Sequence, residues 1–169
     1  VPLSIFDDMV CFLLAKAEQL VGCKFSLDKG PHAEVAFQSS QSRSGLADDP
    51  SRITQFLIQQ LCGEHRMFRD LAINATAIAL IRHLIGSKVM RFSSNNSFVK
   101  WQGDFGYGPS LGLHADQSAL PLPWGRTALT ANTNWCLTDY TLDGGAFAYV
   151  PGSPRFACRP EFPRAVEHA

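Results

Sequence analysis

His114 and Asp116 are separated by a single alanine, a spacing that could bring an imidazole and a carboxylate to one metal ion. Alternate side chains of a β-strand point to the same face, so on a strand these two would project side by side. One further histidine would complete the two-histidine, one-carboxylate triad that holds Fe(II) in non-haem oxygenases. The alternative is a histidine that is merely hydrogen-bonded in the core or at the surface, because so short a motif also arises by chance.

The segments around this pair follow one another in a characteristic order. LHADQ (residues 113–117) precedes the proline-rich LPLPWG, then NWCLTDYT, the turn DGG, and AFAYVPGS. Upstream of them, LIRHLIG is followed by VMRF. In the order and spacing of these parts, roughly residues 75–160 resemble the phytanoyl-CoA dioxygenase family of Fe(II)- and 2-oxoglutarate-dependent oxygenases.

The resemblance implies a double-stranded β-helix, a cupin-like jelly roll, with His114 and Asp116 as iron ligands and catalytic residues at its mouth. It also implies that 2-oxoglutarate chelates the iron and is oxidatively decarboxylated by molecular oxygen while a small organic substrate is hydroxylated. The family tends to place a side chain near 2-oxoglutarate at the position of Asn134. Ordinary strand or turn polarity explains Asn134 equally well, and for Asn132 it is the favoured explanation.

The chain departs from the family pattern at two places. Pro154 follows Pro-Gly-Ser where the family usually has a histidine that is not normally an iron ligand. The distal iron-binding histidine, and the arginine that pairs with the far carboxylate of 2-oxoglutarate, are expected in a later strand. His168 is the only histidine downstream, with no strand pattern before it and no arginine after it, so we interpret it as a solvated terminal residue.

These departures, and a first residue other than methionine, lead us to expect a fragment that lacks the C-terminal strands. Two protein ligands hold Fe(II) weakly, and missing strands leave unpaired edges, so we expect this chain to be inactive alone. The alternative is a non-catalytic jelly-roll binding module or a degenerate remnant of such an enzyme, which Pro154 favours. The intact His114 and Asp116 pair argues against a pure binding module.

Helical patterns dominate the first half of the chain. Ser4 begins a run of apolar residues at helical spacing that Gly22 ends, which predicts a first helix. Residues 24–48 are polar and predict a loop. Asp49-Pro50 predicts the start of a second helix, with one apolar face formed by Ile53, Leu57 and Leu61. A third helix is predicted from Asn74 to Gly86, the position of its capping glycine.

Strand-like patterns follow the third helix. Short runs are separated by glycine, proline and asparagine: KVMRF, SFVKW, SLGLHADQ, TALTANTNWCLTDYTL and AFAYVP. Asp143-Gly144-Gly145 predicts a hairpin turn between two of them. We therefore predict an α+β single domain over residues 1–169, with a helical lead-in over 1–88 and jelly-roll strands over 89–158.

Composition narrows the classes of partner. Fifteen basic and 15 acidic residues give zero formal net charge, which argues against a nucleic-acid partner. No apolar run approaches the roughly 20 residues of a membrane helix, so no membrane partner is expected. The five cysteines are widely spaced and odd in number, which predicts reduced thiols in a cytoplasmic protein. We expect three of them to pack in the core, namely Cys11, Cys62 and Cys136.

Overall fold

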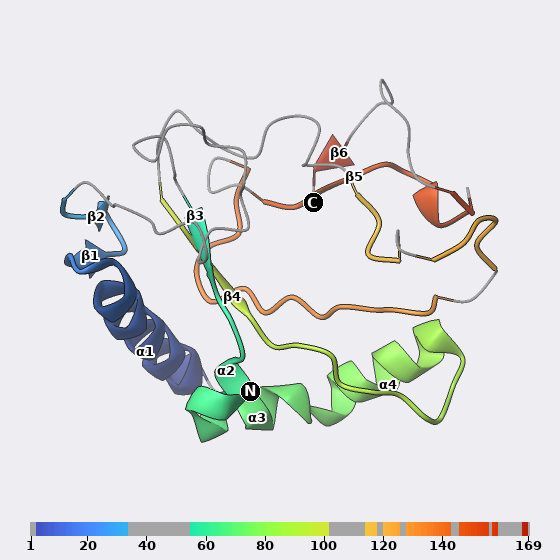
Figure 1. The fold of residues 1–169 in the computed structure, drawn as a ribbon, viewed down its shortest axis with the longest axis horizontal. Coiled ribbons are helices and arrows are strands. Elements are labelled where there is room, and N and C mark those ends of the chain that lie inside the picture. Colours follow the sequence, from blue (N-terminus) through green and yellow to red (C-terminus); the bar gives the residue numbers. More distant parts are fainter. Residues whose placement is uncertain are drawn as a thin grey trace. The chain divides into compact units, whose positions relative to one another are not determined.

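The structure is a computed structural model that forms two compact units. Unit 1 comprises Val1–Ala72 and Ser93–Gly108, and unit 2 comprises Ile73–Phe92 and Pro109–Ala169. Each unit therefore combines segments that are distant in the sequence, and the single domain stays a prediction. The described residues are 3–33, 55–101, 114–117, 120–125, 128–142, 146–155, 157–158 and 167–168 (Figure 1).

Helix α1 (Leu3–Val21) opens unit 1 and confirms the first predicted helix. Its buried face consists of residues four apart, which lie on one side of a helix: Met9, Leu13 and Ala17. Gly22 adopts the left-handed conformation (φ 75°) that commonly ends helices, and its N–H donates to the Glu18 carbonyl at 2.9 Å. Local signals in the sequence are therefore sufficient to define this helix.

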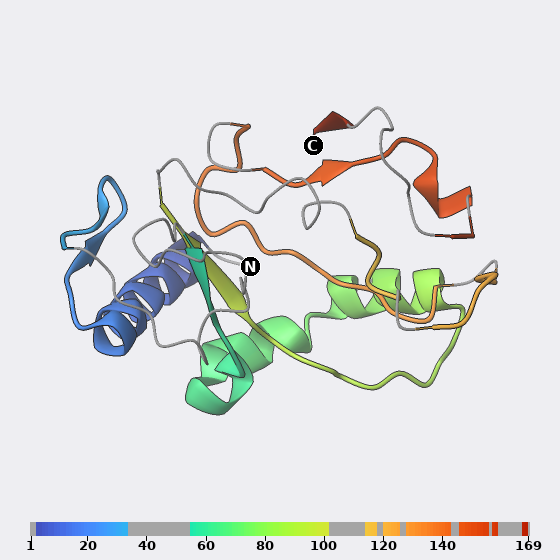
Figure 2. The same cartoon turned by 45° about the horizontal axis from the view of Figure 1, so that its top comes forward.

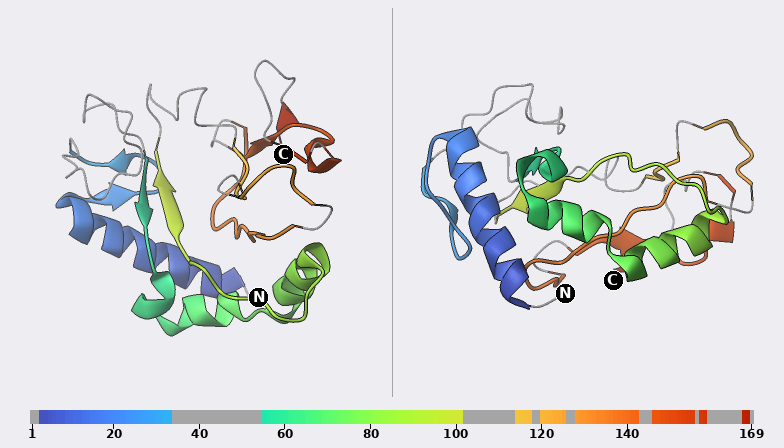
Figure 3. Two further views of the ribbon diagram at one scale, coloured as in Figure 1. Left: turned by 45° about the vertical axis from the view of Figure 1, so that its right-hand side comes forward. Right: turned by 90° about the horizontal axis from the view of Figure 1, so that it is seen from below.

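A small hairpin follows α1 in place of part of the predicted loop. Strands β1 (Phe25–Ser26) and β2 (Gly30–Pro31) pair antiparallel, and the hairpin lies at the C-terminal end of α1 (Figure 3). Phe25 is buried, and its ring meets that of Trp101 edge-on with centroids 5.7 Å apart. The loop prediction is thus wrong over these strands, and residues 34–48 lie outside the described part of the chain.

The start of the second predicted helix, at Asp49, lies outside the described residues. Over residues 55–58, the first ones described after it, the helix prediction is wrong. Strand β3 (Gln55–Ile58) stands there and pairs antiparallel with β4 (Ser97–Lys100) (Figure 2). Phenylalanine, leucine and isoleucine in succession suit a strand that has a partner, and the partner lies some 40 residues away in the sequence. The helix begins only after Gln60, as α2 (Leu61–Glu64).

Helix α3 (Arg66–Ala72), which the sequence patterns did not predict, completes the core of unit 1. Phe68 is buried and packs edge-on against Phe12 of α1, with ring centroids 5.5 Å apart. Lys16 and Glu64 form an ion pair of 2.9 Å between α1 and α2. Burial of each large apolar side chain stabilises the fold by roughly 1.5–3 kcal/mol. The buried apolar side chains of unit 1 are therefore its main source of stability.

Unit 2 begins with helix α4 (Ala75–Ile85), which confirms the third predicted helix. The Asn74 side chain caps it by accepting hydrogen bonds from the N–H groups of Thr76 and Ala77, both at 3.1 Å. Gly86 ends it in the left-handed conformation (φ 69°). Of the described residues on α4, only Ala77 is buried.

The remaining described part of unit 2 contains little regular structure. Strands β5 (Ala148–Tyr149) and β6 (Glu167–His168) pair antiparallel, and a short 3₁₀ helix covers Ser153–Arg155. The other described stretches for which strands were predicted, residues 88–92, 114–117 and 128–142, are not strands. Helices together with small antiparallel sheets confirm the α+β class, but the described residues do not form a complete jelly roll.

The cysteine predictions are partly wrong. All five cysteines are free, yet Cys11 and Cys136 are exposed and Cys62 is half-buried. Cys11 lies two residues from Met9, about 200° around a helix, and therefore faces away from the core. Burial raises the pKa of the Cys62 thiol, and the positive charge of Arg69 acts in the opposite direction by lowering it.

In the described residues, no helix has the length and apolar character needed to cross a membrane.

Candidate metal centre

His114 and Asp116 lie side by side in unit 2, although a strand does not place them there. His114 has no regular secondary structure, and Asp116 and Gln117 form a turn. The His114 Nε2 atom is 3.4 Å from the Asp116 Oδ1 atom. The adjacency expected from the spacing is present, but a turn rather than a pleated strand produces it.

The separation of these two atoms suits ligands of one cation. Histidine nitrogen and carboxylate oxygen bind metals such as zinc at roughly 2.0–2.2 Å, so two such ligands at right angles are about 3 Å apart. The side chains of His114 and Asp116 are 68% and 47% exposed, which leaves them accessible to an ion and to further ligands. Nitrogen and carboxylate donors together fit Fe(II).

Asn132 is the third side chain at this position. Its Nδ2 atom donates a hydrogen bond of 2.6 Å to Asp116 Oδ2, the carboxylate oxygen other than the one nearest His114. The sequence favours ordinary polarity for Asn132, and for Asn134 it supports ordinary polarity and a place near 2-oxoglutarate equally. Asn134 is exposed, and in the described part of the chain it makes no hydrogen bond to His114 or Asp116. The only indication for Asn132 in the sequence was that this polar residue shares a face with Asn134 on the predicted strand.

A second contact joins the same two segments. The Gln117 Oε1 atom accepts a hydrogen bond of 3.2 Å from the Leu129 N–H. The Gln117 carbonyl also accepts a hydrogen bond from the Leu120 N–H at 3.0 Å. Side chains of adjacent residues thus hold the turn against the segment over residues 129–132.

The third ligand expected for an iron site is not identified among the described residues. In that part of the chain, no three His, Cys, Asp or Glu side chains are grouped to hold a metal ion. The backbone of His168 belongs to β6, where His168 pairs with Ala148. This pairing concerns the backbone alone, so the interpretation of His168 as a solvated terminal residue stays a prediction.

Comparison with known proteins identifies the family. The family model described as phytanoyl-CoA dioxygenase (PhyH) matches residues 21–168. The chain belongs to the phytanoyl-CoA dioxygenase family. Dioxygenase af480 of Aspergillus fumigatus is 32% identical over 121 residues, which cover 70% of this chain. The aligned part spans 36% of that curated relative, and no solved structure matches the chain.

The match to the phytanoyl-CoA dioxygenase family confirms the resemblance carried by the His-x-Asp region and extends it. The motifs indicated roughly residues 75–160, whereas the family match begins at residue 21 and so includes β3 and β4. Most of α1 lies before the match. The helical lead-in of the sequence prediction is therefore largely part of the family region.

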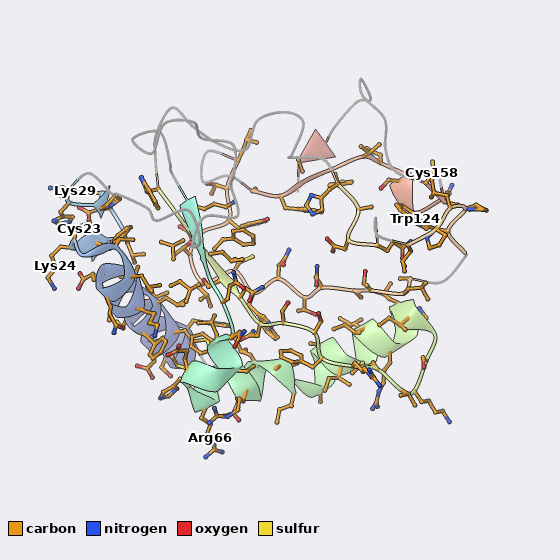
Figure 4. The ribbon with its side chains drawn as sticks, viewed as in Figure 1. Cys23, Lys24, Lys29, Arg66, Trp124 and Cys158 are labelled. Carbon is orange, nitrogen blue, oxygen red and sulfur yellow. The ribbon has the colours of Figure 1, made fainter. Side chains whose placement is uncertain are left out.

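The proline-rich segment of this phytanoyl-CoA dioxygenase family member is anchored at Trp124. Its backbone N–H donates to the Ala157 carbonyl at 2.9 Å, and its indole N–H donates to the Leu120 carbonyl at 3.3 Å. Trp124 and Cys158 accordingly lie close together in unit 2 (Figure 4). The residue that fixes the Trp124 backbone, Ala157, thus lies three positions after Pro154 in the sequence.

A cavity of about 500 Å³ lies in unit 1 and contains none of the predicted site residues. Two of its polar side chains make local contacts. His65 Nδ1 accepts from the Met67 N–H at 3.2 Å, and Asp70 pairs with Arg66 at 3.4 Å. The cavity is lined by Ile5, Asp8, Met9, Phe12, His65, Met67, Asp70 and Leu71.

Proposed function

We propose that this chain is part of an Fe(II)- and 2-oxoglutarate-dependent oxygenase that hydroxylates a small organic substrate with molecular oxygen. The observation that carries the proposal is the 3.4 Å approach of His114 Nε2 to Asp116 Oδ1 within the region that matches the family. The relative from Aspergillus fumigatus, named a dioxygenase, supports the same class of reaction. A double-stranded β-helix, with the β5–β6 pair as one of its parts, is the fold proposed for the complete protein.

In this proposal His114 and Asp116 hold the iron, and Asn134 lies beside 2-oxoglutarate. When bound, iron and 2-oxoglutarate supply the oxidising chemistry: one atom of O₂ enters succinate, formed with CO₂ from 2-oxoglutarate, and the other enters a substrate C–H bond as hydroxyl. His114 must be neutral and Asp116 ionised to donate their lone pairs, so protons compete with the metal. The exposure of both side chains leaves room for the remaining ligands.

The second candidate function is a non-catalytic jelly-roll binding module or a degenerate remnant of such an enzyme. Pro154, which replaces the usual family histidine, favours it. A two-ligand set would also hold a metal weakly, because each ligand lost removes part of the binding free energy. Metal binding distinguishes the two candidates, since a module without iron chemistry has no requirement for the pair.

The test is calorimetric titration of 2-oxoglutarate into the full-length protein in the presence of Mn(II), a redox-inert substitute for Fe(II). We expect metal-dependent binding that is lost in His114→Ala and in Asp116→Ala. His83→Ala and Asp139→Ala are matched controls, because both residues are exposed and lie outside the proposed site. Absence of metal-dependent binding in the wild-type protein would reject the oxygenase and favour the module.

A further inference from the structure

The two oxygen atoms of the Asp116 carboxylate have different neighbours. Oδ2 accepts the 2.6 Å hydrogen bond from Asn132, and Oδ1 lies 3.4 Å from His114 Nε2. A carboxylate rotates easily about its terminal bond and can bind a cation through one oxygen or through both. The Asn132 hydrogen bond opposes that rotation, because turning the carboxylate would break it.

We propose that Asn132 is a positioning residue, which occupies Asp116 Oδ2 and thereby presents Oδ1 alone to the metal beside His114. This inference rests on the proposed function. An amide N–H bound to a carboxylate is a charge-assisted hydrogen bond, and such bonds are stronger than neutral ones. Partners of this kind orient metal ligands in proteins, and their loss typically lowers metal affinity by about 10–100-fold.

A second hydrogen bond, made by the backbone three residues before Asn132, holds the segment that carries Asn132. The Leu129 N–H is bonded to the side chain of Gln117, so the Asn132 segment is held beside the motif turn by a contact independent of the carboxylate. Asn132 is also exposed, and its replacement therefore leaves no cavity in the core. Because of these two facts, we expect replacement of Asn132 to change the orientation of the Asp116 carboxylate without lowering the stability of unit 2.

The experiment compares Mn(II) affinity of the metal-free full-length protein, measured from the electron paramagnetic resonance signal of free Mn(II). We expect Asn132→Leu and Asn132→Ala to weaken binding about 10–100-fold. Thr133→Leu, at the next residue, which is also exposed, is the matched control and is expected to bind like the wild type. Asn132→Gln retains the amide donor and is expected to recover much of the affinity.

Two further readouts exclude a merely structural role. The melting temperature of the metal-free protein is expected to be the same in Asn132→Leu and in Thr133→Leu. On Mn(II) binding, the infrared spectrum of the wild type is expected to show the wide separation of carboxylate stretches that marks one-oxygen coordination. That separation is expected to narrow in Asn132→Leu, as the freed carboxylate binds through both oxygens.

The possible failures are distinguishable. Wild-type protein that does not bind Mn(II) would reject the proposed function and this inference together. Wild-type binding that Asn132→Leu and Asn132→Ala both retain would overturn the inference alone and leave the oxygenase proposal standing. A loss of affinity that follows an equal loss of thermal stability would likewise overturn positioning in favour of a structural role.

Discussion

The two units of the protein are stabilised in different ways. Eight of the ten buried apolar residues in the described part of the chain belong to unit 1, and the other two, Ala77 and Val150, belong to unit 2. Most large apolar side chains that are exposed among the described residues are in unit 2. Unit 1 is therefore held by a packed core, whereas the described part of unit 2 relies on short turns and hydrogen bonds.

This difference has a consequence for the candidate site. Burial of one large apolar side chain contributes roughly 1.5–3 kcal/mol, whereas a net hydrogen bond contributes about 0.5–1.5 kcal/mol. Substitutions in unit 1 should thus change global stability. Substitutions around His114 and Asp116, which are exposed, should change ligand binding first. The metal-binding tests proposed for Asn132 and Asp116 depend on this separation.

The largest expected effect is that of Leu61→Ala in unit 1. Leu61 is 2% exposed at the start of α2, so truncation leaves a cavity and should lower the free energy of unfolding by about 2–5 kcal/mol. Leu80→Ala on α4 is the matched control, because Leu80 is 61% exposed, and should cost about 0.5 kcal/mol or less. Urea unfolding measures both. Equal losses would remove the contrast between the units.

The next effect concerns Gly30, which has φ 69° and lies against Trp101. A Cβ at this position would lie 2.5 Å from the Trp101 Cβ. Gly30→Ala should therefore lower the free energy of unfolding through this steric clash by about 1–3 kcal/mol, in addition to the cost of placing alanine in the left-handed conformation. Gly22→Ala is the control, since Gly22 has φ 75° with nothing within 4 Å of its added Cβ. It should cost only about 1–2 kcal/mol. Thermal unfolding monitored by tryptophan fluorescence tests whether the hairpin is part of the unit 1 core.

Local signals explain what could be predicted from the sequence. Helix α1 ends, and helix α4 begins and ends, where the sequence indicates, because Gly22, Asn74 and Gly86 act on their immediate neighbours. Strand β3 was missed because its state depends on β4, a partner far away in the chain. Helical spacing of Leu57 and Leu61 favoured the wrong structure, since the sequence does not reveal that pairing.

The candidate site shows the same division. The adjacency of His114 and Asp116 follows from their spacing, although the turn that produces it was expected to be a strand. The contact of Asn132 with Asp116 joins residues 16 apart, and only the fold brings them together. Residue types and spacing thus predicted the two proposed ligands, whereas the contact that makes Asn132 a proposed positioning residue required three-dimensional information.

A smaller effect is expected in unit 2, from Asn74→Ala at the start of α4. This change removes the acceptor for the N–H groups of Thr76 and Ala77 and should cost about 1 kcal/mol. Asn74→Asp retains an acceptor and should restore stability. Circular dichroism at 222 nm during urea unfolding measures both variants. An unchanged midpoint in Asn74→Ala would mean that packing, rather than capping, determines where α4 begins.

The smallest effect is the pH dependence contributed by Glu18 at the end of α1. The side-chain hydrogen bond from Lys24 and then the Phe25 N–H lower the pKa of Glu18 from its usual 4.5. Because the folded pKa lies below the unfolded one, the contribution is fully present above about pH 4.5 and is lost as the pH falls through the lowered pKa. Glu18→Gln should therefore flatten the acid limb of the free energy of unfolding below pH 4.5, and Lys24→Gln should flatten it in part. An acid limb that both variants leave unchanged would show that hairpin β1–β2 is held in unit 1 by the packing of Phe25 against Trp101 rather than by this carboxylate.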